Sequence, residues 1–527
     1  MSKIFKGFLC LCVIWLPVAC SDNTTDVQYV EKAQENIDAG NMKAALIEAK
    51  NALQKNPNNP RARLMTGQLQ FEMGNIAASE KELIKARELG IEDEMILPLM
   101  SRVLLLQEKH DELQRISLEN LITRDQSAAT ILAAQGLGKL VQGEVDLAAE
   151  KIDQAVSLDS QSAYAGVAKA RLLVAKQEDD LARKELDHVL QQDGDYALAW
   201  SLLGDLETRH KNLAKAEAAY TKAVENSVDN SHDLLKRALL RIKQKKYEYA
   251  QKDIDFLKKQ SPQQTGINYA QGLIHFLNNR LPEAREAFEL TLRANNSLHL
   301  QARYFLSLTH LGLGNRELAE NHSNQFLAAV PLSIPGRKLK ASIELGNQQY
   351  APVEELIRPV VSYQEDDVQA LNLLANALLK QNKTDEAIEL LEKVVNLQPD
   401  SAVSHLRLGA GLLAGGRQTE GVGHIEKALE IEPQLQQANN LLVQYYIDQK
   451  EFEKALGTAK DYREHHPDSA VPYILIGRTQ LALGQEEDAV EAFTHARKIA
   501  PGDPTASHSL AALAIRMKKY QEARGYY

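Results

Sequence analysis

The sequence predicts an all-α solenoid of about fifteen helix–turn–helix units, of which the last is incomplete. Three observations support this fold class. A pattern recurs about every 34 residues, small residues occupy two fixed positions of the pattern, and each unit holds two stretches of about a dozen residues with helical apolar periodicity. The units form one continuous array over residues 26–527 and start at residues 26, 60, 94, 129, 163, 197, 231, 265, 300, 334, 368, 402, 436, 470 and 504.

The first helix of each unit carries a small residue at the eighth position. That residue is Gly, Ala or Ser in fourteen of the fifteen units, and Val443 is the exception. The twentieth position, in the second helix, is alanine in eleven of the fifteen. Because small side chains let two helix axes approach closely, positions 8 and 20 are predicted to face each other inside each unit.

The turn between the two helices of a unit favours Gly or Asn, as at Gly40, Gly143 and Asn382. These residues adopt the left-handed backbone conformation that ends a helix at little cost. The second helix is then predicted to end before a proline, which cannot continue it. Such prolines are Pro57, Pro262, Pro331, Pro399, Pro433, Pro467 and Pro501.

The third unit is the least regular one. Leu113 stands where alanine is expected, and Pro98 falls inside the first helix. A proline is tolerated in the first turn of a helix, so this helix is predicted to begin at Pro98. We therefore expect a local irregularity between residues 90 and 128.

The repeat pattern resembles a known family. Together with the period and the small-residue pairs, the sixth unit carries the relevant residues: Trp200, Leu203, Gly204, Ala216, Tyr220 and Ala223. These features resemble the tetratricopeptide repeat, and the resemblance covers residues 26–527. It implies a right-handed superhelix whose concave groove binds proteins or peptides.

Residues 1–19 are predicted to be a signal peptide. Lys3 and Lys6 precede a short apolar run from Gly7 to Val18, which is too short to span a membrane comfortably. The rest of the chain offers neither a disulfide nor a thiol nucleophile, because all the cysteines lie in or directly after this segment: Cys10, Cys12 and Cys20.

Val18, Ala19 and Cys20 resemble the end of a bacterial lipobox, although Pro17 replaces the usual leucine. The resemblance implies that Cys20 becomes the lipidated amino terminus and that residues 20–25 form the lipidated cysteine and a short tether. The alternative is an ordinary signal peptide cut near Ala19.

The first 120 residues bear a closer resemblance to one group of repeat proteins. The matching segments are residues 42–57, Ala62 to Arg63, Gly67, Gly74, residues 80–83 and Leu97 to Pro98. They resemble the PEP-CTERM system repeat lipoproteins, which are Gram-negative envelope proteins associated with exopolysaccharide loci and a protein-sorting system. This resemblance implies a lipid-anchored, periplasm-facing protein, and Ser21 after the cysteine favours the outer membrane over the inner one.

Composition and motifs exclude several kinds of activity. The formal net charge is −10, whereas nucleic-acid binding requires a basic stripe. The sequence contains no catalytic motif and no phosphate-binding loop. His465 and His466 lack a third ligand at a spacing suited to zinc. We therefore predict a protein that is not an enzyme, has no metal or cofactor and does not bind nucleic acid.

Two surfaces of the expected groove stand out. In tetratricopeptide folds the second, fifth, ninth and twelfth positions of each first helix line the groove. In the later units, these and neighbouring positions give an amide ladder with two arginines, our candidate site for partner binding: Asn372, Asn376, Arg407, Asn440, Gln444 and Arg478. The middle units give a secondary apolar strip: Leu239, Tyr269, Leu273, Phe276, Tyr304 and Leu308. The alternative for the ladder is an ordinary solvated face, and for the strip it is burial by superhelical packing.

These observations predict a non-enzymatic envelope scaffold that binds protein or peptide partners, in support of exopolysaccharide or protein-sorting machinery. The alternative is a subunit that handles polysaccharide directly in an export or polymerisation complex. Sugar binding requires exposed aromatic rings, and aromatic residues make up 6% of the chain. That low fraction favours protein partners.

Overall fold

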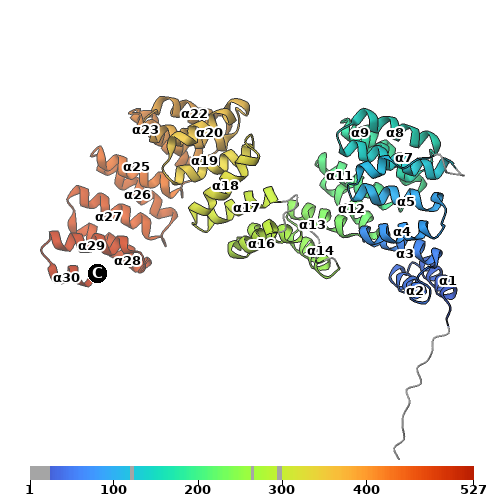
Figure 1. Ribbon diagram of the computed structural model, residues 1–527. Coiled ribbons are helices and arrows are strands. Elements are labelled where there is room, and N and C mark those ends of the chain that lie inside the picture. The colour runs from blue at the N-terminus through green and yellow to red at the C-terminus, as the bar shows by residue number, and fades with distance from the viewer. Residues whose placement is uncertain (1–23, 119–123, 261, 263–265, 294–298, 527) are drawn as a thin grey trace, which may run out of the picture. The chain divides into compact units, whose positions relative to one another are not determined.

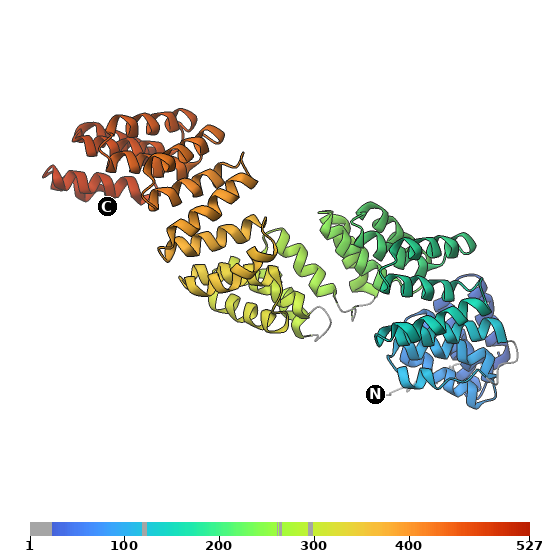
Figure 2. The same ribbon diagram turned by 90° about the horizontal axis from the view of Figure 1, so that it is seen from above.

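A computed structural model describes residues 24–118, 124–260, 262, 266–293 and 299–526. Over these ranges the chain is all-α, with thirty helices and no strand (Figures 1 and 2). It forms two compact units, Met1–Ile274 and His275–Tyr527. The predicted signal peptide and Cys20 lie outside the described residues.

The first unit contains fourteen helices and the start of α15 (Ile267–Leu277), inside which the boundary between the units falls. The helices are α1 (Asp26–Asp38), α2 (Met42–Lys55), α3 (Pro60–Glu72), α4 (Ile76–Glu88), α5 (Asp93–Leu106), α6 (His110–Gln114), α7 (Arg124–Val141), α8 (Val145–Leu158), α9 (Ala163–Ala175), α10 (Asp179–Gln192), α11 (Ala197–Arg209), α12 (Leu213–Asn226), α13 (Ser231–Lys243) and α14 (Tyr247–Gln260).

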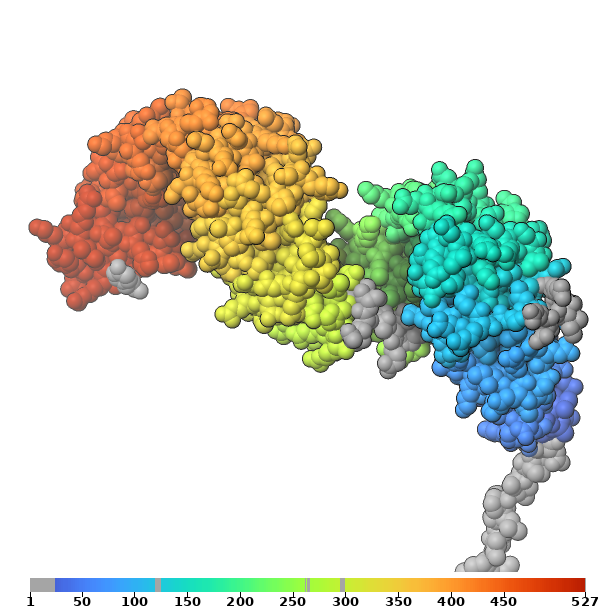
Figure 3. Space-filling model, turned by 45° about the horizontal axis from the view of Figure 1, so that its top comes forward, coloured from blue at the N-terminus to red at the C-terminus, as the bar shows by residue number. Residues whose placement is uncertain are grey.

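The second unit curves from yellow through orange to red in Figure 3. Its helices are α16 (Leu281–Arg293), α17 (His299–Gly312), α18 (Arg316–Ala329), α19 (Ile334–Gly346), α20 (Tyr350–Tyr363), α21 (Val368–Lys380), α22 (Thr384–Leu397), α23 (Ala402–Ala414), α24 (Gln418–Ile431), α25 (Gln436–Asp448), α26 (Phe452–His465), α27 (Ala470–Leu483), α28 (Glu486–Ile499), α29 (Pro504–Arg516) and α30 (Tyr520–Tyr526).

The two helices of a repeat meet at positions 8 and 20, as predicted. In the second repeat the Ser79 hydroxyl donates a hydrogen bond to the Gly67 carbonyl at 2.7 Å. The residue at position 24 is a third partner in this contact, which the repeat pattern did not predict. A Cβ atom added at Gly204 would lie 2.5 Å from ring carbons of Tyr220. The eighth residue is therefore small because a large side chain of the second helix occupies the space beside it.

Both predicted helix boundaries are confirmed. Gly40, Gly143 and Asn382 have φ angles of 75°, 80° and 59° at the turn within their repeats. Helix α2 ends at Lys55 and α28 at Ile499, each two residues before a proline. The same turn accepts Lys, Gln or Glu in other repeats, at a higher conformational cost than glycine.

The third repeat is irregular, but not as predicted at its start. Helix α5 begins at Asp93, which accepts a hydrogen bond from Arg87 at 2.6 Å, and runs through Pro98. The predicted start at Pro98 is therefore wrong. A proline inside a helix leaves the carbonyl four residues earlier without its helical donor, and here the Ser127 hydroxyl approaches that carbonyl, of Glu94, at 3.5 Å. The irregularity itself is confirmed, because the second helix, α6, has only 5 residues.

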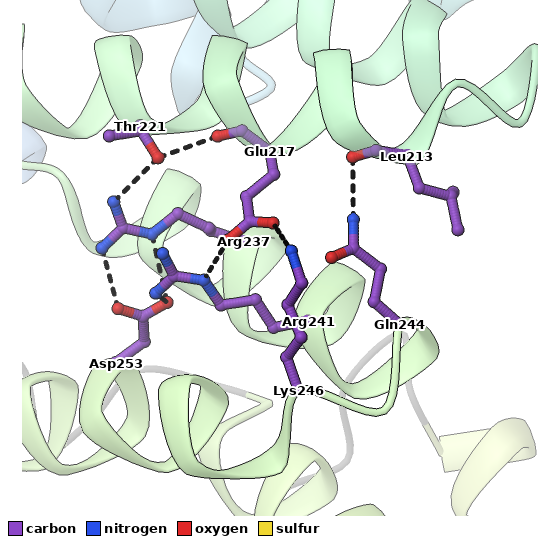
Figure 4. A network of polar contacts seen from close by, with 8 residues as sticks. All are labelled: Leu213, Glu217, Thr221, Arg237, Arg241, Gln244, Lys246 and Asp253. Atoms are coloured by element: carbon purple, nitrogen blue, oxygen red, sulfur yellow. Dashed lines mark hydrogen bonds and ion pairs between the residues drawn. The ribbon is translucent and has the colours of Figure 1, made fainter.

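Buried charges join the sixth and seventh repeats (Figure 4). Arg237 and Arg241 of α13 donate to the carboxylate of Asp253 in α14 at 2.8 and 2.7 Å. Glu217 of α12 accepts from Arg241 at 2.8 Å and from Lys246 at 2.7 Å. Asp253 is 5% exposed. The network therefore ties three consecutive helices together and serves the fold.

None of the helices in the described ranges has both the length and the hydropathy that crossing a membrane requires.

Candidate functional site

The second unit contains a cavity on the face formed by the first helix of each repeat. The cavity has a volume of about 430 Å³ and lies between α21 and α23, with one wall residue from α22. Its lining combines polar groups with an apolar surface: Gln369, Asn372, Leu373, Asn376, Leu379, Leu391, Arg407 and Ala410. Three of the six residues predicted for the partner site, Asn372, Asn376 and Arg407, therefore share one cavity.

Most polar side chains of this cavity have hydrogen-bonding groups without a partner in the described part of the chain. Asn376 and Arg407 are exposed, and neither makes a hydrogen bond or ion pair within the part of the chain that the structure describes. Asn372 donates to the Val368 carbonyl at 2.8 Å, while its side-chain oxygen is buried without a hydrogen-bond partner in the same part. Gln369, at the second position of its repeat, also lines the cavity. The wall thus offers amide donors and acceptors and one guanidinium group beside leucine side chains.

Burial and helix periodicity place these groups. Leu371, Leu374 and Leu378 of α21 are buried against the core. Asn372 and Asn376 are four residues apart and therefore lie on one side of the same helix. Arg407, at the sixth position of the next repeat, lines the cavity from α23. No carboxylate is among the residues that line the cavity.

The other half of the predicted ladder is arranged differently. Gln444 donates to Asp448 at 2.7 Å, and its side-chain oxygen accepts a hydrogen bond from Arg478. Asn440 is half-buried and makes no hydrogen bond with its side chain within the described ranges. These three residues do not line the cavity. The structure therefore divides the ladder into an open part in α21 and α23 and a part in α25 and α27 whose polar groups partly satisfy each other.

The apolar strip is distributed over both units, and much of it is used in packing. In the first unit Tyr269 and Leu273 are 8% and 9% exposed and Leu239 is half-buried. Burial raises the pKa of the Tyr269 phenol to about 12. These side chains contribute mainly to the core of the first unit.

In the second unit, Phe276, Tyr304 and Leu308 are half-buried. Tyr304 and Leu308 pack against a small apolar core in α18 and α19. The ring of Tyr304 also lies 5.4 Å from that of Phe326. The strip therefore keeps only part of its apolar surface accessible in this unit.

A second cavity, which no sequence pattern predicted, lies in the first unit. It has a volume of about 480 Å³ and is lined by residues of α3, α5 and the start of α7. Arg102 in its wall lies over two aromatic rings, 4.6 Å from the centroid of Phe71 and 5.0 Å from that of Tyr164. These contacts join the second, third and fifth repeats across the concave side. Glu72 and Glu94 also line this cavity, so its charge is mixed.

His465 and His466, which were considered for a metal site, lie at the end of α26 and contact residues of that helix. His465 donates to the Asp461 carbonyl at 2.9 Å, and His466 lies edge-on to the ring of Tyr462 with 5.3 Å between centroids. Within the described ranges no group of three or more His, Cys, Asp or Glu side chains could hold a metal ion.

Comparison with solved structures finds chains of similar fold at low identity. The crystal structure of the APC/C hetero-tetramer Cut9-Hcn1 contains a chain with 13% identity and a TM-score of 0.42, over 93% of this chain and 96% of that one. PilF of Pseudomonas aeruginosa shows 18% identity and a TM-score of 0.37, over 41% and 97%. MamA of Desulfovibrio magneticus RS-1, from residue 41 to its end, shows 19% identity and a TM-score of 0.31, over 32% and 96%. A search of curated proteins finds no match.

Family models match the chain in both units. Models of the tetratricopeptide repeat match residues 36–102 and 344–408, residues 167–230, 235–299 and 269–333, and residues 470–503. Together these segments cover more than half of the sequence, and the helix pairs, turns and small-residue contacts described above recur within them. The chain therefore belongs to the tetratricopeptide repeat proteins.

Proposed function

We propose that this protein is a non-enzymatic scaffold of the Gram-negative cell envelope, anchored by a lipid on Cys20, which binds extended segments of partner proteins in the groove of residues 368–503. Tetratricopeptide repeats generally act as protein-interaction scaffolds. The observation that carries the binding site is the open cavity between α21 and α23, where Asn376 and Arg407 have no partner within the described ranges.

The chemistry of this cavity fits an extended peptide. An amide side chain offers both a donor and an acceptor, so Asn372 and Asn376 can pair with a peptide backbone without requiring a particular side chain. Arg407 can form a charge-assisted hydrogen bond with an acidic side chain or a terminal carboxylate. Leu373 and Leu379 offer apolar contact for a side chain on the same segment. Further along the groove, Asn440, Gln444 and Arg478 can extend the contact once Gln444 exchanges its internal bonds for bonds to the partner.

The envelope setting rests on the sequence alone. Lys3, Lys6 and the apolar run before Cys20 support export and lipidation, and the resemblance of residues 1–120 to the PEP-CTERM system lipoproteins supports a role beside exopolysaccharide or protein-sorting machinery. Direct handling of polysaccharide is the second candidate. The hydroxyl-binding capacity of the amides would suit it, but the cavity lining contains no aromatic side chain on which a sugar ring could stack.

The test is crosslinking followed by capture of the intact lipoprotein from envelopes of its own host. Asn376→Ala combined with Arg407→Ala should abolish the protein adducts without changing the melting curve, because both side chains are exposed. A matched control combines Asn396→Ala with Lys460→Ala, two exposed residues outside the cavity. Undiminished capture by the cavity variant would contradict the proposed site. Loss of capture only after changes at Phe276 and Tyr304 would move the site to the apolar strip.

Protease and polysaccharide lyase treatments separate the two candidate functions. Captured material that disappears with protease supports a protein partner. Material that resists protease and disappears with a lyase would support polysaccharide handling instead.

A further inference from the structure

The outer face of α14, in the first unit, carries exposed aromatic and basic side chains in alternation. Tyr249 and Phe256 are 56% and 43% exposed. Lys252 and Lys259 are exposed as well. The four residues are separated by three, four and three positions, so they form a single stripe along the helix. Lys245, in the turn before α14, is exposed at the beginning of this stripe.

The stripe is a basic region in an acidic protein. The chain has a formal net charge of −10, yet residues 231–260 contain nine lysines and arginines against four aspartates and glutamates. Arg237, Arg241 and Lys246 of this region are neutralised by the network around Asp253 and Glu217.

The lysines of the stripe are not neutralised in this way. Lys245, Lys252 and Lys259 make no ion pair within the described part of the chain, and Lys252 lies 5.4 Å from the ring centroid of Tyr249. Lys252 therefore contacts only an aromatic ring with its charge, and within the described residues no carboxylate neutralises any of the three lysines.

The corresponding faces of the preceding repeats are different. The same four register positions hold Leu147, Glu150, Gln154 and Ser157 in α8 and Leu181, Lys184, His188 and Gln191 in α10. In α12 they hold Lys215, Ala218, Lys222 and Glu225, of which Lys222 and Glu225 pair with each other. Among these second helices α14 alone combines two aromatic residues with two unpaired lysines. A face that contacts only water gains nothing from two exposed aromatic rings. This combination therefore indicates an interaction surface.

The spacing of the stripe indicates what shape its partner has. Residues three and four positions apart form the seam along which one α-helix packs on another. Ile254 and Leu257 are buried on the opposite side of α14, so the stripe faces away from the core. Aromatic side chains of a helix seam pack against apolar residues of the partner, and the lysines between them select carboxylates.

The flank of the stripe distinguishes a helix from a broad anionic surface. Glu248 and Asp255 are exposed along one edge of α14, and Asp255 accepts from Gln251 at 2.9 Å. A bilayer or a long polyanion would bring negative charge against both carboxylates. A helix about 10 Å wide can instead cover the stripe alone and place its own basic residues over that edge.

We propose that the outer face of α14 is a docking surface for an acidic amphipathic α-helix of a partner protein. The partner helix places apolar residues against Tyr249 and Phe256 and carboxylates against Lys252 and Lys259. This surface belongs to the first unit, whereas the groove of residues 368–503 belongs to the second. The protein thereby has one surface for an extended segment and another for a helix.

The test uses a fluorescently labelled, helix-stapled synthetic peptide of the length of α14. It carries leucine at the positions that face Tyr249 and Phe256 and glutamate at those that face Lys252 and Lys259. Lysine lies along one edge. Fluorescence anisotropy with the full chain should show binding that weakens as salt is added. Lys252→Glu combined with Lys259→Glu, and separately Phe256→Ala, should each weaken binding about tenfold or more. A peptide with lysine in place of each glutamate should not bind.

The matched control is Leu181→Ala combined with Lys184→Glu, at the equivalent positions of α10, which should bind the peptide like the parent. The groove variant, Asn376→Ala with Arg407→Ala, should also bind it normally. Absence of binding by the parent chain, equal loss in the α10 control, or equal affinity for the basic peptide would each overturn the proposal. Binding of phosphatidylglycerol vesicles that is lost in the α14 variants, with no peptide binding, would replace it with a membrane surface.

Discussion

Removing the charge of Asp253 should destabilise the first unit locally and strongly. The carboxylate is 5% exposed and accepts from Arg237 and Arg241, whose side chains are 12% and 14% exposed. Asp253→Asn keeps the shape but leaves two buried guanidinium groups without their shared anion. Loss of one partner of a buried ion pair costs about 3–5 kcal/mol. We expect the free energy of local unfolding to decrease by about 3 kcal/mol, at the lower end of this range, because Arg241 retains its hydrogen bond to Glu217.

Amide hydrogen exchange measures this effect where it should occur. In a solenoid each repeat contacts mainly its neighbours, so the loss should be confined to α12, α13 and α14 and the repeats beside them. About 3 kcal/mol corresponds to roughly a hundredfold faster exchange of the protected amides in these helices. Exchange in α21 to α24, in the second unit, should not change.

Asp255→Asn is the matched control on the same helix. Asp255 is exposed and accepts a hydrogen bond only from Gln251 within the described residues, so its substitution should stay within about 0.5 kcal/mol. Equal exchange rates in the two variants would contradict the stabilising role of the Asp253 network, and so would a loss of protection spread evenly over the chain.

Three further predictions concern packing, pH and lipidation. Gly204→Ala should cost about 1–3 kcal/mol because the new methyl group would lie 2.5 Å from the ring of Tyr220. Gly423→Ala, which meets no atom within 4 Å, should instead stabilise α24 by about 0.5–1 kcal/mol, and chemical denaturation compares the two. Burial lowers the pKa of His322 from 6.5 to about 4, so the unfolded chain binds a proton between these values that the folded chain does not. Stability should therefore fall as the pH decreases through this window, and His322→Asn should reduce the decrease in melting temperature between about pH 7 and about pH 4.5. Cys20→Ser should abolish incorporation of labelled palmitate, and unchanged labelling would exclude lipidation at this residue.

The repeat fold was predictable because every repeat forms the same helix contact and the same turn within itself. Glycine or alanine at position 8 indicates a close contact between the two helices, and Gly143 or Asn382 indicates a turn with a left-handed residue. Both depend on residues within one repeat, so they leave a periodic trace in the sequence. The start of α5 was mispredicted because the rule for Pro98 is a local one, whereas the Ser127 hydroxyl that approaches the Glu94 carbonyl comes from another helix.

The candidate site was predictable in register but not in accessibility. Groove positions of a first helix repeat with the 34-residue period, so Asn372 and Asn376 could be placed on one face from the sequence, with Arg407 at a neighbouring position. The structure brings all three into one cavity. The same rule selected Tyr269 and Leu273, which are buried, and Gln444, which is bonded to Arg478. Residue type and position in the repeat do not predict which neighbour buries a side chain or forms its hydrogen bonds.

The helix pairs, their turns and the face of each residue could thus be predicted, because they follow from periodicity and from interactions within one repeat. The sequence could not show which groove residues remain open, how Arg102 joins three repeats through Phe71 and Tyr164, or which basic residues are neutralised. Burial and charge pairing depend on side chains that are far apart in the sequence. Their meeting is set by the small rotation from each repeat to the next, which accumulates along the solenoid.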